Sequence, residues 1–308
     1  MCIRDRTNTV LMIRPANFGS NPDTIDDNKF QNSMSQDSSS EISQKAIVEF
    51  DTMVKALTIE DINVIVIQDT NTPIKPDAIF PNNWISSHSN GTIATYPMMA
   101  ATRRIERRED IVTKLIEEYG YKKRYSFEYH EEEDIYLEGT GSLVFDRINK
   151  VVYACLSKRT NIKVLEKFSV LYNYEKVVFN ASDRNGNPIY HTNVMMAIAK
   201  DHVVICLDSI RDKDERQSVI NKLSNSGKEI IEISYHQMEQ FAGNMLQIKS
   251  KLGAPIMLMS GAAYDCLSSS QIDKLSSYSK ILQIPIPTIE HYGGGSVRCM
   301  VMEVFKPV

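Results

Sequence analysis

The sequence predicts an α/β fold in which five units, each made of a strand, a second strand, a helix and a third strand, close into a five-bladed α/β propeller. Strands that open with a small polar residue start at positions 83, 141, 193, 244 and 295, which are 58, 52, 51 and 51 residues apart. A period this regular indicates a repeat architecture in which each unit packs on its neighbours. The fifth unit can be completed only by the apolar segment at 10–15, so the pattern predicts a ring closed around a central cavity.

Hydrophobic periodicity predicts the elements of each unit in order. A buried strand at 10–15, a helix at 41–57 and a short strand at 64–67 belong to the unit that closes the ring. The other expected strands are 83–88, 92–96, 141–145, 151–156, 176–179, 193–198, 203–207, 229–233, 244–248, 256–260 and 280–284, and the alternating apolar run at 297–304 is expected to be the last. The remaining helices are expected at 102–119, 161–172, 212–224 and 269–279.

Residues 9–308 are expected to form a single domain. Residues 1–8 begin with Met-Cys-Ile-Arg-Asp-Arg, which fits no element and looks like translated adapter sequence, so we expect this segment to be artefactual or disordered. The polar segment at 17–36 is unusually long for a connection within a compact domain, and such loops are commonly functional or disordered. Its residues Phe18 and Phe30 would allow it to serve as a lid.

Composition limits the classes of function. The chain has 308 residues, 42% hydrophobic and 24% charged, with a net charge of −4, which is typical of a soluble globular protein and predicts no nucleic-acid partner. No apolar run is long enough to cross a membrane, so no membrane association is expected. The five cysteines are odd in number, widely spaced and without a CxxC pair, which favours a reducing, cytoplasmic compartment.

Ring closure would bring the first residues of the units to one axis, and a cysteine and a histidine are among them. Cys299 follows three glycines at 293–295, which let the backbone turn tightly beside a ligand. His191 opens the third unit, and a thiol nucleophile needs a base that is close in space rather than in sequence. The pair predicts nucleophilic catalysis; the alternative is that Cys299 packs in the core and His191 hydrogen-bonds a turn.

Charged residues at the same level of the ring are candidates for supporting roles. Glu138, between Leu137 and Gly139, could fix the tautomer of a histidine or accept a substrate N–H, and the alternative is a solvated loop acid. One arginine of the cluster at 103–108, or Arg159, could bind a substrate carboxylate bidentately. No histidine pair has metal-ligand spacing and no glycine-rich phosphate motif occurs, so neither a metal nor a cofactor is expected.

Several short motifs, taken in this order, resemble the guanidine-modifying (pentein) superfamily, which includes arginine deiminases, dimethylarginine hydrolases and amidinotransferases. The superfamily motifs are Leu137-Glu138-Gly139, His191-Thr192-Asn193 and the glycine-rich approach to Cys299. Four further motifs resemble the branch of citrulline-utilisation hydrolases: Ile13-Arg14-Pro15-Ala16-Asn17-Phe18, Phe30-Gln31, Phe80-Pro81-Asn82-Asn83-Trp84 and Arg103-Arg104-Ile105-Glu106-Arg107. The resemblance extends from Val10 to Phe305 and implies the pentein fold, a pseudo-fivefold α/β propeller that forms one catalytic domain.

The resemblance also implies roles by position. In catalysis, Cys299 would be the nucleophile, His191 the general acid and base, and Glu138 the group that grips a substrate nitrogen. In binding, Arg103 and Arg159 would bind the substrate's α-carboxylate, and Asp77 would lie near its α-amine. Asn83 and Asn193 would contact the side group of the substrate. Arg104 is the alternative to Arg103.

The sequence departs from the superfamily pattern at Asn83 and Asn193. Relatives that act on arginine hold the guanidinium with an aspartate at the first position and, in the deiminases, at the second. A buried cation without a carboxylate costs on the order of several kcal/mol, whereas an amide offers a donor and an acceptor to a neutral ureido group. The pocket is therefore expected to favour citrulline, although arginine dihydrolases, which pass through bound citrulline, also carry asparagine at the first position.

These observations predict a cysteine-dependent hydrolase that converts citrulline and water to ornithine, CO2 and ammonia. The enzymatic alternatives are an arginine dihydrolase, an arginine deiminase and a dimethylarginine hydrolase, and the non-enzymatic alternative is a pentein-fold binding protein. The expected partner is a small amino-acid substrate, and analogy with relatives allows a homodimer.

Overall fold

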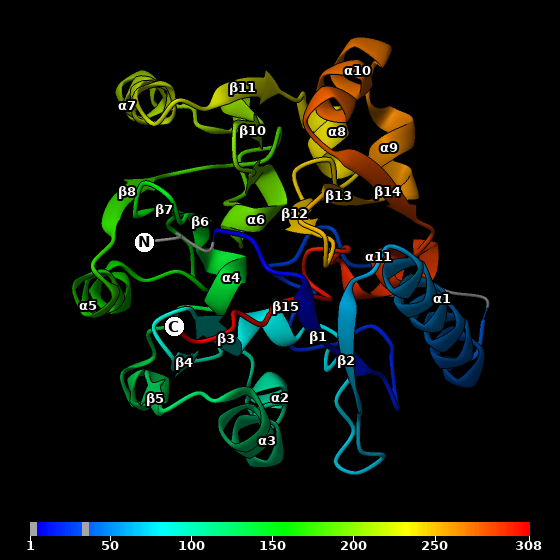
Figure 1. Ribbon diagram of the computed structural model, residues 1–308. Helices are drawn as coiled ribbons and strands as arrows, with labels where there is room; N and C mark the ends of the chain where they lie inside the picture. Colours follow the sequence, from blue (N-terminus) through cyan, green and yellow to red (C-terminus); the bar gives the residue numbers. More distant parts are fainter. Residues whose placement is uncertain (1–4, 33–36) are drawn as a thin grey trace.

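Five small sheets form a ring in the computed structural model, which describes residues 5–32 and 37–308. Each sheet has three strands, and its central strand pairs antiparallel with one neighbour and parallel with the other. The long helices α1, α3, α5, α7 and α10 lie on the outside of the ring (Figure 1). This arrangement is the predicted five-bladed α/β propeller.

Each sheet belongs to one unit of the ring. The first unit contains β3 (Ile85–His88), β4 (Thr92–Thr95), α2 (Ala101–Arg104), α3 (Glu109–Tyr119) and β5 (Lys123–Ser126). The second contains α4 (Gly139–Ser142), β6 (Val144–Asp146), β7 (Val151–Cys155), α5 (Ile162–Tyr172) and β8 (Glu175–Phe179). The third contains α6 (Thr192–Met195), β9 (Met196–Ile198), β10 (His202–Ile205), α7 (Lys213–Asn225) and β11 (Glu229–Glu232). The fourth contains β12 (Leu246–Lys249), β13 (Pro255–Ser260), α9 (Gly261–Cys266), α10 (Ser269–Tyr278) and β14 (Lys280–Ile284). The fifth contains β15 (Met302–Glu303), β1 (Thr9–Arg14), α1 (Ser39–Ile59) and β2 (Asn63–Gln68). Shorter helices between units are η1 (Pro81–Asn83), η2 (Glu128–Glu133), α8 (Tyr235–Glu239) and α11 (Pro287–Gly293), and η3 (Leu207–Ser209) lies within the third unit, between β10 and α7.

The fifth unit shows how local sequence produces this arrangement. Val10 of β1 pairs antiparallel with Glu303 of β15 and parallel with Val64 of β2. A parallel pair cannot be joined by a hairpin, so the chain crosses over through α1. Ser38 and Glu41 cap the start of this helix with reciprocal hydrogen bonds. Its buried residues recur at helical spacing and pack beside the sheet: Ile42, Ala46, Phe50, Met53 and Leu57.

The predicted starts of three units are wrong in the same way. The first residues of the strands expected at 83–88, 141–145 and 193–198 belong instead to the short helical turns η1, α4 and α6. Glycine and small polar residues favour turns over strands, and Gly139 has a φ of 46°, which a strand does not contain. The polar side chains at the axis are therefore carried by turns that precede the strands.

Two further predictions differ from the structure. The helix expected at 102–119 is two helices, α2 and α3. The run at 297–304 contains only the two-residue strand β15, and Cys299 lies in the turn before it. An alternation of apolar and polar residues normally indicates a strand with one buried face and one solvated face. Residues 292–305 are all buried, so the alternation in this run does not have that meaning.

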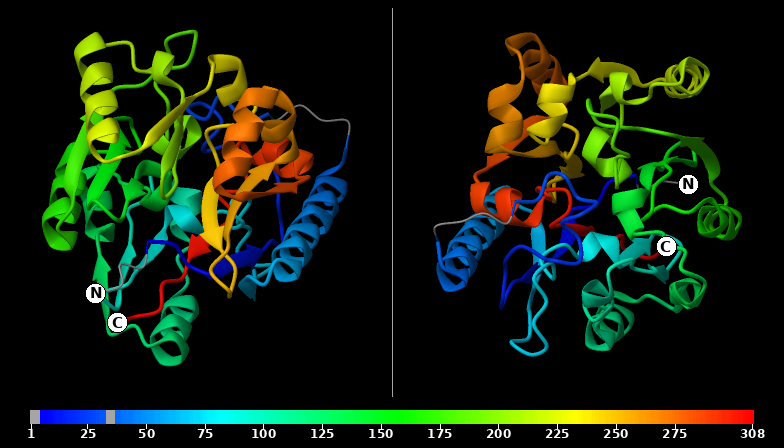
Figure 2. Two further views of the ribbon diagram at one scale, coloured as in Figure 1. Left: turned by 45° about the horizontal axis from the view of Figure 1, so that its top comes forward. Right: turned by 180° about the vertical axis from the view of Figure 1, so that it is seen from behind.

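Both segments that flank β1 contact the rest of the ring. Arg6 and Thr7 are buried and hydrogen-bond to Gln247 and to the carbonyl of Val304. The expectation that residues 1–8 are artefactual or disordered stays a prediction, and residues 1–4 lie outside the described part. After β1, the chain crosses the face of the ring (Figure 2), and the segment expected to be a lid is described as far as Asn32. Over residues 5–32 and 37–308, the structure contains no helix with the length and apolarity to cross a membrane.

Candidate active site

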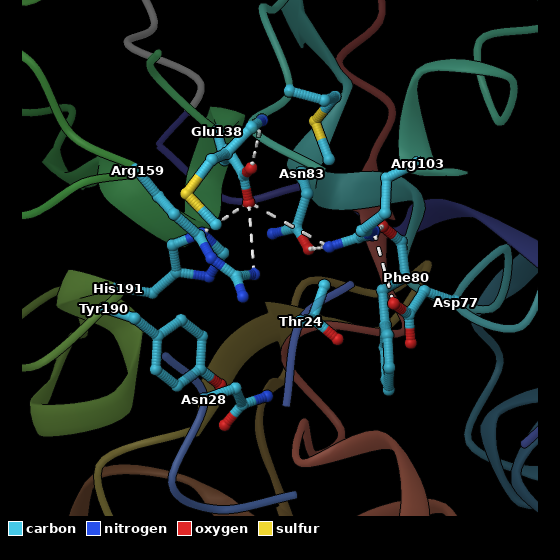
Figure 3. Close-up of polar contacts among 12 residues, drawn as sticks. Thr24, Asn28, Asp77, Phe80, Asn83, Arg103, Glu138, Arg159, Tyr190 and His191 are labelled. Carbon is cyan, nitrogen blue, oxygen red and sulfur yellow. Dashed lines mark hydrogen bonds and ion pairs between the residues drawn. The ribbon is translucent and has the colours of Figure 1, made fainter. Parts of the chain in front are cut away.

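Side chains from several units meet around a small cavity at the centre of the ring (Figure 3). The cavity has a volume of about 20 Å³, which is room for about one water molecule. Its lining residues are Thr24, Asn28, Asp77, Phe80, Asn83, Arg103, Arg159, Tyr190, His191, Gly293, Gly294, Gly295 and Cys299. An amino acid can therefore enter only after part of this wall has moved.

Cys299 lies in the turn between α11 and β15, beside Gly295. A Cβ on Gly295 would lie 3.0 Å from the ring of Phe80 and 3.4 Å from the Cβ of Cys299, so a side chain at position 295 would press against both residues. The sulfur of Cys299 accepts hydrogen bonds from Nδ2 of Asn193 at 3.4 Å and from Nδ2 of Asn244 at 3.3 Å. The N–H groups of two amides therefore point at this sulfur.

His191 and Glu138 form a buried pair beside the cavity. Nε2 of His191 donates to Oε2 of Glu138 at 2.9 Å, and Oε1 of Glu138 accepts from the backbone N–H of Met99. Because a carboxylate only accepts, this bond puts the imidazole proton on Nε2 and leaves Nδ1 as the free base. Burial lowers the pKa of His191, and Glu138 only partly offsets this effect, so the imidazole is neutral near pH 7.

Glu138 is an ionised carboxylate although it is fully buried. Burial by itself raises the pKa of Glu138, but Arg159, whose Nη1 lies 3.5 Å away, and the bond from His191 outweigh it and lower this pKa to about 2. The carboxylate of Glu138 orients the imidazole of His191 and balances the positive charge of Arg159. Its predicted contact with a substrate nitrogen stays a prediction.

Gly141 allows two of these groups to approach each other. A Cβ on Gly141 would lie 2.5 Å from Nδ2 of Asn83 and 2.6 Å from Nδ1 of His191. The imidazole and the amide therefore occupy the space that a side chain at position 141 would need, and the turn α4 can carry only glycine there.

Arg103 is held between carboxylates. Its Nε and Nη2 bind Glu106 at 2.9 Å each, its Nε lies 3.7 Å from Asp77, and its Nη1 donates to Oδ1 of Asn83 at 2.9 Å. Arg103 is buried and lines the cavity, whereas Arg104 is partly exposed and binds the carbonyl of Met98. Of the two neighbouring arginines, Arg103 is thus the one that faces the site.

Residues 17–32, most of the segment predicted to serve as a lid, lie against the cavity, which Thr24 and Asn28 line. Asp27 binds Nε and Nη2 of Arg159 at 2.7 and 2.6 Å, and Asn21 donates to Asp77 at 2.8 Å. Asn28 donates to the carbonyls of Gly293 and Gly294. Burial works against the charge of Arg159, but Glu138 and Asp27 outweigh it and raise the pKa of this guanidinium.

The structure brings all eight predicted site residues together. Six of them line the cavity, namely Asp77, Asn83, Arg103, Arg159, His191 and Cys299, while Glu138 and Asn193 contact His191 and Cys299 directly. Their chemical roles stay predictions. The sequence analysis did not assign Asp27, Asn28, Glu106 or Asn244 to the site. Glu106 looked like part of a solvated charge run, and only its spacing of three residues from Arg103 gave a signal.

The described residues contain no group of three or more His, Cys, Asp or Glu side chains that could hold a metal ion.

Solved structures with this arrangement of units are pentein-fold proteins. The N-terminal domain of ArgZ, described as an arginine dihydrolase from the ornithine–ammonia cycle in cyanobacteria, matches with a TM-score of 0.73 and 17% identity over 97% of this chain and 98% of that one. AgrE in complex with ornithine and NAD+ matches with a TM-score of 0.74 and 17% identity over 97% of this chain and 39% of that one. A dimethylarginine dimethylaminohydrolase adduct with 4-chloro-2-hydroxymethylpyridine matches with a TM-score of 0.65 and 15% identity over 97% and 100% of the two chains. Fold and site together define a protein of the pentein superfamily, as predicted.

A more particular assignment comes from the family models. The model described as N,N-dimethylarginine dimethylhydrolase, eukaryotic, matches residues 14–306, and the chain belongs to this family. The family consists of hydrolases that act on guanidino carbon–nitrogen bonds. A comparison with curated protein sequences finds no match.

Proposed function

We propose that the protein hydrolyses citrulline to ornithine, CO2 and ammonia, with Cys299 as the nucleophile. The proposal is carried by two buried amide atoms that lack a hydrogen-bond partner among the described residues: Nδ2 of Asn83, a donor, and Oδ1 of Asn193, an acceptor. A buried polar atom without a partner is costly. A ligand that supplies both an acceptor and a donor would therefore bind favourably between them.

Arg103 fixes the orientation of Asn83. A guanidinium can only donate, so the oxygen of Asn83 must face Nη1 of Arg103 and its NH2 group must face away. Asn83 is thus a donor toward any ligand. The carbonyl oxygen of a ureido group would accept this N–H, whereas a guanidinium, which carries only N–H groups, would meet a second donor.

Asn193 supplies the opposite polarity. Its Nδ2 faces the sulfur of Cys299, which leaves Oδ1 free to accept. The terminal NH2 of a ureido group would donate to that oxygen. A donor at Asn83 and an acceptor at Asn193 match the C=O and NH2 of one ureido group, and would hold its carbon near the sulfur of Cys299.

The reaction follows from these positions. The thiolate of Cys299 adds to the ureido carbon and one C–N bond breaks. The departing nitrogen takes a proton that Nδ1 of His191 has first taken up from solvent, so His191 is neutral again after this step. A carbamoyl thioester remains on Cys299. Nδ1 of neutral His191 then takes a proton from water, the resulting hydroxide adds to the thioester carbon, and the C–S bond breaks to regenerate the thiolate. The released carbamate breaks down to CO2 and the second amine, so citrulline and one water give ornithine, CO2 and ammonia.

The remaining charged groups suit the amino-acid end of citrulline. Arg159 and Asp77 both line the cavity, and they would bind the α-carboxylate and the α-ammonium group. The lid already contacts both of them through Asp27 and Asn21. Closure over a bound amino acid would exclude bulk water from the thioester.

Arginine dihydrolysis is the second candidate, and Glu138 favours it. This buried carboxylate is ionised and would compensate part of the charge of a guanidinium. The family acts on guanidino groups, and a dihydrolase must also accept citrulline as an intermediate.

The test is the release of ornithine and ammonia from citrulline, arginine and dimethylarginine by the purified protein. Ornithine from citrulline alone, lost in Cys299→Ala and kept in the control Cys266→Ala, is the expected result. Ornithine from arginine as well would establish the dihydrolase. Conversion of arginine or dimethylarginine that stops at citrulline would overturn the proposal.

A further inference from the structure

Asn244 is a buried amide that the proposed reaction does not yet use. It lies two residues before β12, and Gly243 beside it has no room for a side chain, since a Cβ there would lie 2.2 Å from the carbonyl oxygen of Val194. This close approach brings the fourth unit against α6 of the third. As a result, Asn244 reaches both the third unit and the turn that carries Cys299.

The orientation of the Asn244 amide is fixed from both ends. Oδ1 accepts from the backbone N–H of Arg298 at 3.1 Å, and Nδ2 donates to the backbone oxygen of Asn193 at 2.9 Å. Flipping the amide would set donor against donor and acceptor against acceptor. The second hydrogen on Nδ2 is therefore held toward the sulfur of Cys299, 3.3 Å away. The amide of Asn193 is not fixed from both ends in this way, because its Oδ1 has no hydrogen-bond partner among the described residues.

Positive charges around the cavity are already committed to carboxylates. Arg103 binds Glu106, Arg159 binds Asp27 and Glu138, and His191 is neutral and bound to Glu138. On the other side of the sulfur, the guanidinium of Arg298 binds Glu303 and the carbonyl of Val301. The other ionisable groups at the cavity are Asp77 and Tyr190. A buried anion needs hydrogen bonds or an opposite charge. Because the positive charges are already paired, the fixed N–H groups are left to stabilise a negative charge on this sulfur.

We propose that Asn244 is a positioning residue that holds Cys299 as a thiolate and sets its place relative to the third unit. This inference rests on the proposed function, in which Cys299 is the nucleophile. Contacts of one amide join the backbone at 193, the backbone at 298 and the reactive sulfur, which lies 3.3 Å from Nδ2 and 3.7 Å from Oδ1. Asn244 thus fixes the distance between the unit that carries His191 and the turn that carries the thiol.

The test is the pH titration of the Cys299 thiol in the whole protein. Thiolate formation is followed by ultraviolet absorbance as the difference between each protein and the same protein carrying Cys299→Ser. Asn244→Asp keeps an oxygen for the N–H of Arg298 but loses the N–H to sulfur, and Asn244→Ala loses both. Gln247→Leu removes another buried amide from the same unit, one that binds Arg6 and Ser279, and is the matched control.

The midpoint of thiolate formation is expected to rise by about one to two pH units in both Asn244 variants, because a hydrogen bond to a charged group contributes on the order of a tenfold or larger preference for the charged form. The control should keep the wild-type midpoint. Folded Asn244 variants that titrate with the wild-type midpoint would overturn the proposal. The titration needs no substrate, so a protein that shows the shift but releases no ornithine from citrulline would refute only the proposed function.

Discussion

The chemical character of Asn83 is set by the residue behind it. An asparagine can offer either end of its amide, but Arg103 binds the oxygen and so presents the NH2 group to the cavity. An aspartate at this position would keep one oxygen for Arg103 and present the other. One atom therefore decides whether position 83 donates to a neutral carbonyl or accepts from a cation.

Asn83→Asp is expected to change the ratio of kcat/KM for citrulline to kcat/KM for arginine by about tenfold or more in favour of arginine. The physical reason is that the polarity of one buried hydrogen bond to a charged group is reversed, which is worth about 1.5–3 kcal/mol. Both constants are measured by product release. Asn161→Asp makes the same chemical change at the N-cap of α5 and should leave the ratio unchanged, and an unchanged ratio in Asn83→Asp would contradict the role assigned to this amide.

Glu138 should make part of the protein's stability depend on pH in the acid range. Its pKa is about 2 in the folded protein and 4.5 ordinarily, so the folded state binds this proton less tightly than the unfolded state. The contribution to the free energy of unfolding is therefore complete above about pH 4.5 and lost as the pH falls toward 2, and it is on the order of 3 kcal/mol.

Urea unfolding of wild type and Glu138→Gln between pH 6 and pH 2 tests this expectation. The wild type should be more stable at pH 6, and the difference should shrink as the solution is acidified. Glu117→Gln, on the exposed face of α3, should stay within about 0.5 kcal/mol of wild type throughout. A difference between wild type and Glu138→Gln that does not vary with pH would show that the carboxylate is not ionised in the folded protein.

At the scale of elements, the turns that open the units carry most of the site. Hydrophobic periodicity predicts strands and helices well, because their burial patterns have a fixed period, but it assigned η1, α4 and α6 to strands. Their residues are buried on all sides at the ring axis, where no period distinguishes a turn from a strand. Glu138, His191 and Cys299 could be predicted because the repeat brings unit openings together. Asp27 could not, since its partner Arg159 lies 132 residues away and depends on how the lid folds.

The lid is attached to the site mainly through the ion pair of Asp27 with Arg159. Asp27 also lines a larger neighbouring pocket of about 410 Å³, and Tyr190 lines both this pocket and the small cavity. Asp27 thus binds Arg159, which lines the small cavity, and lines the larger pocket as well. The same arginine is expected to bind the substrate's carboxylate, so the lid and the substrate share one guanidinium.

Asp27→Asn is expected to raise the amide hydrogen exchange of residues 17–32 by about tenfold to a hundredfold, since a hydrogen bond between charged groups contributes about 1.5–3 kcal/mol to closure. Exchange is measured by mass spectrometry on the unliganded protein. The exposed neighbour Asp26 provides the control Asp26→Asn, for which exchange should not change. Equal exchange in both variants would mean that other contacts, such as those of Asn28, hold the lid closed.

For the whole molecule, stability depends on the unit in which distant parts of the chain meet. Leu11 is fully buried in β1, where it pairs with Met302 of β15 and with Ile65 of β2. Leu11→Ala is expected to lower the free energy of unfolding by about 2–5 kcal/mol. Leu252→Ala removes the same atoms from a residue that is 92% exposed. This control should change the free energy of unfolding by less than about 0.5 kcal/mol. Urea denaturation measures both, and similar values for the two variants would contradict the place of β1 in the core.

The pairing of Val10 with Glu303 also imposes an order in time. During synthesis, β1 and β2 can pair with each other early, but the sheet of the fifth unit is complete only when β15 pairs with β1, and contacts between residues this distant in sequence form late. Cys299 emerges from the ribosome just ahead of β15. A nascent chain can thus hold the lid segment, the histidine and both arginines before it holds the thiol, and the proposed nucleophile arrives together with the strand that completes the ring. An unfinished chain therefore lacks the thiol that the proposed reaction needs.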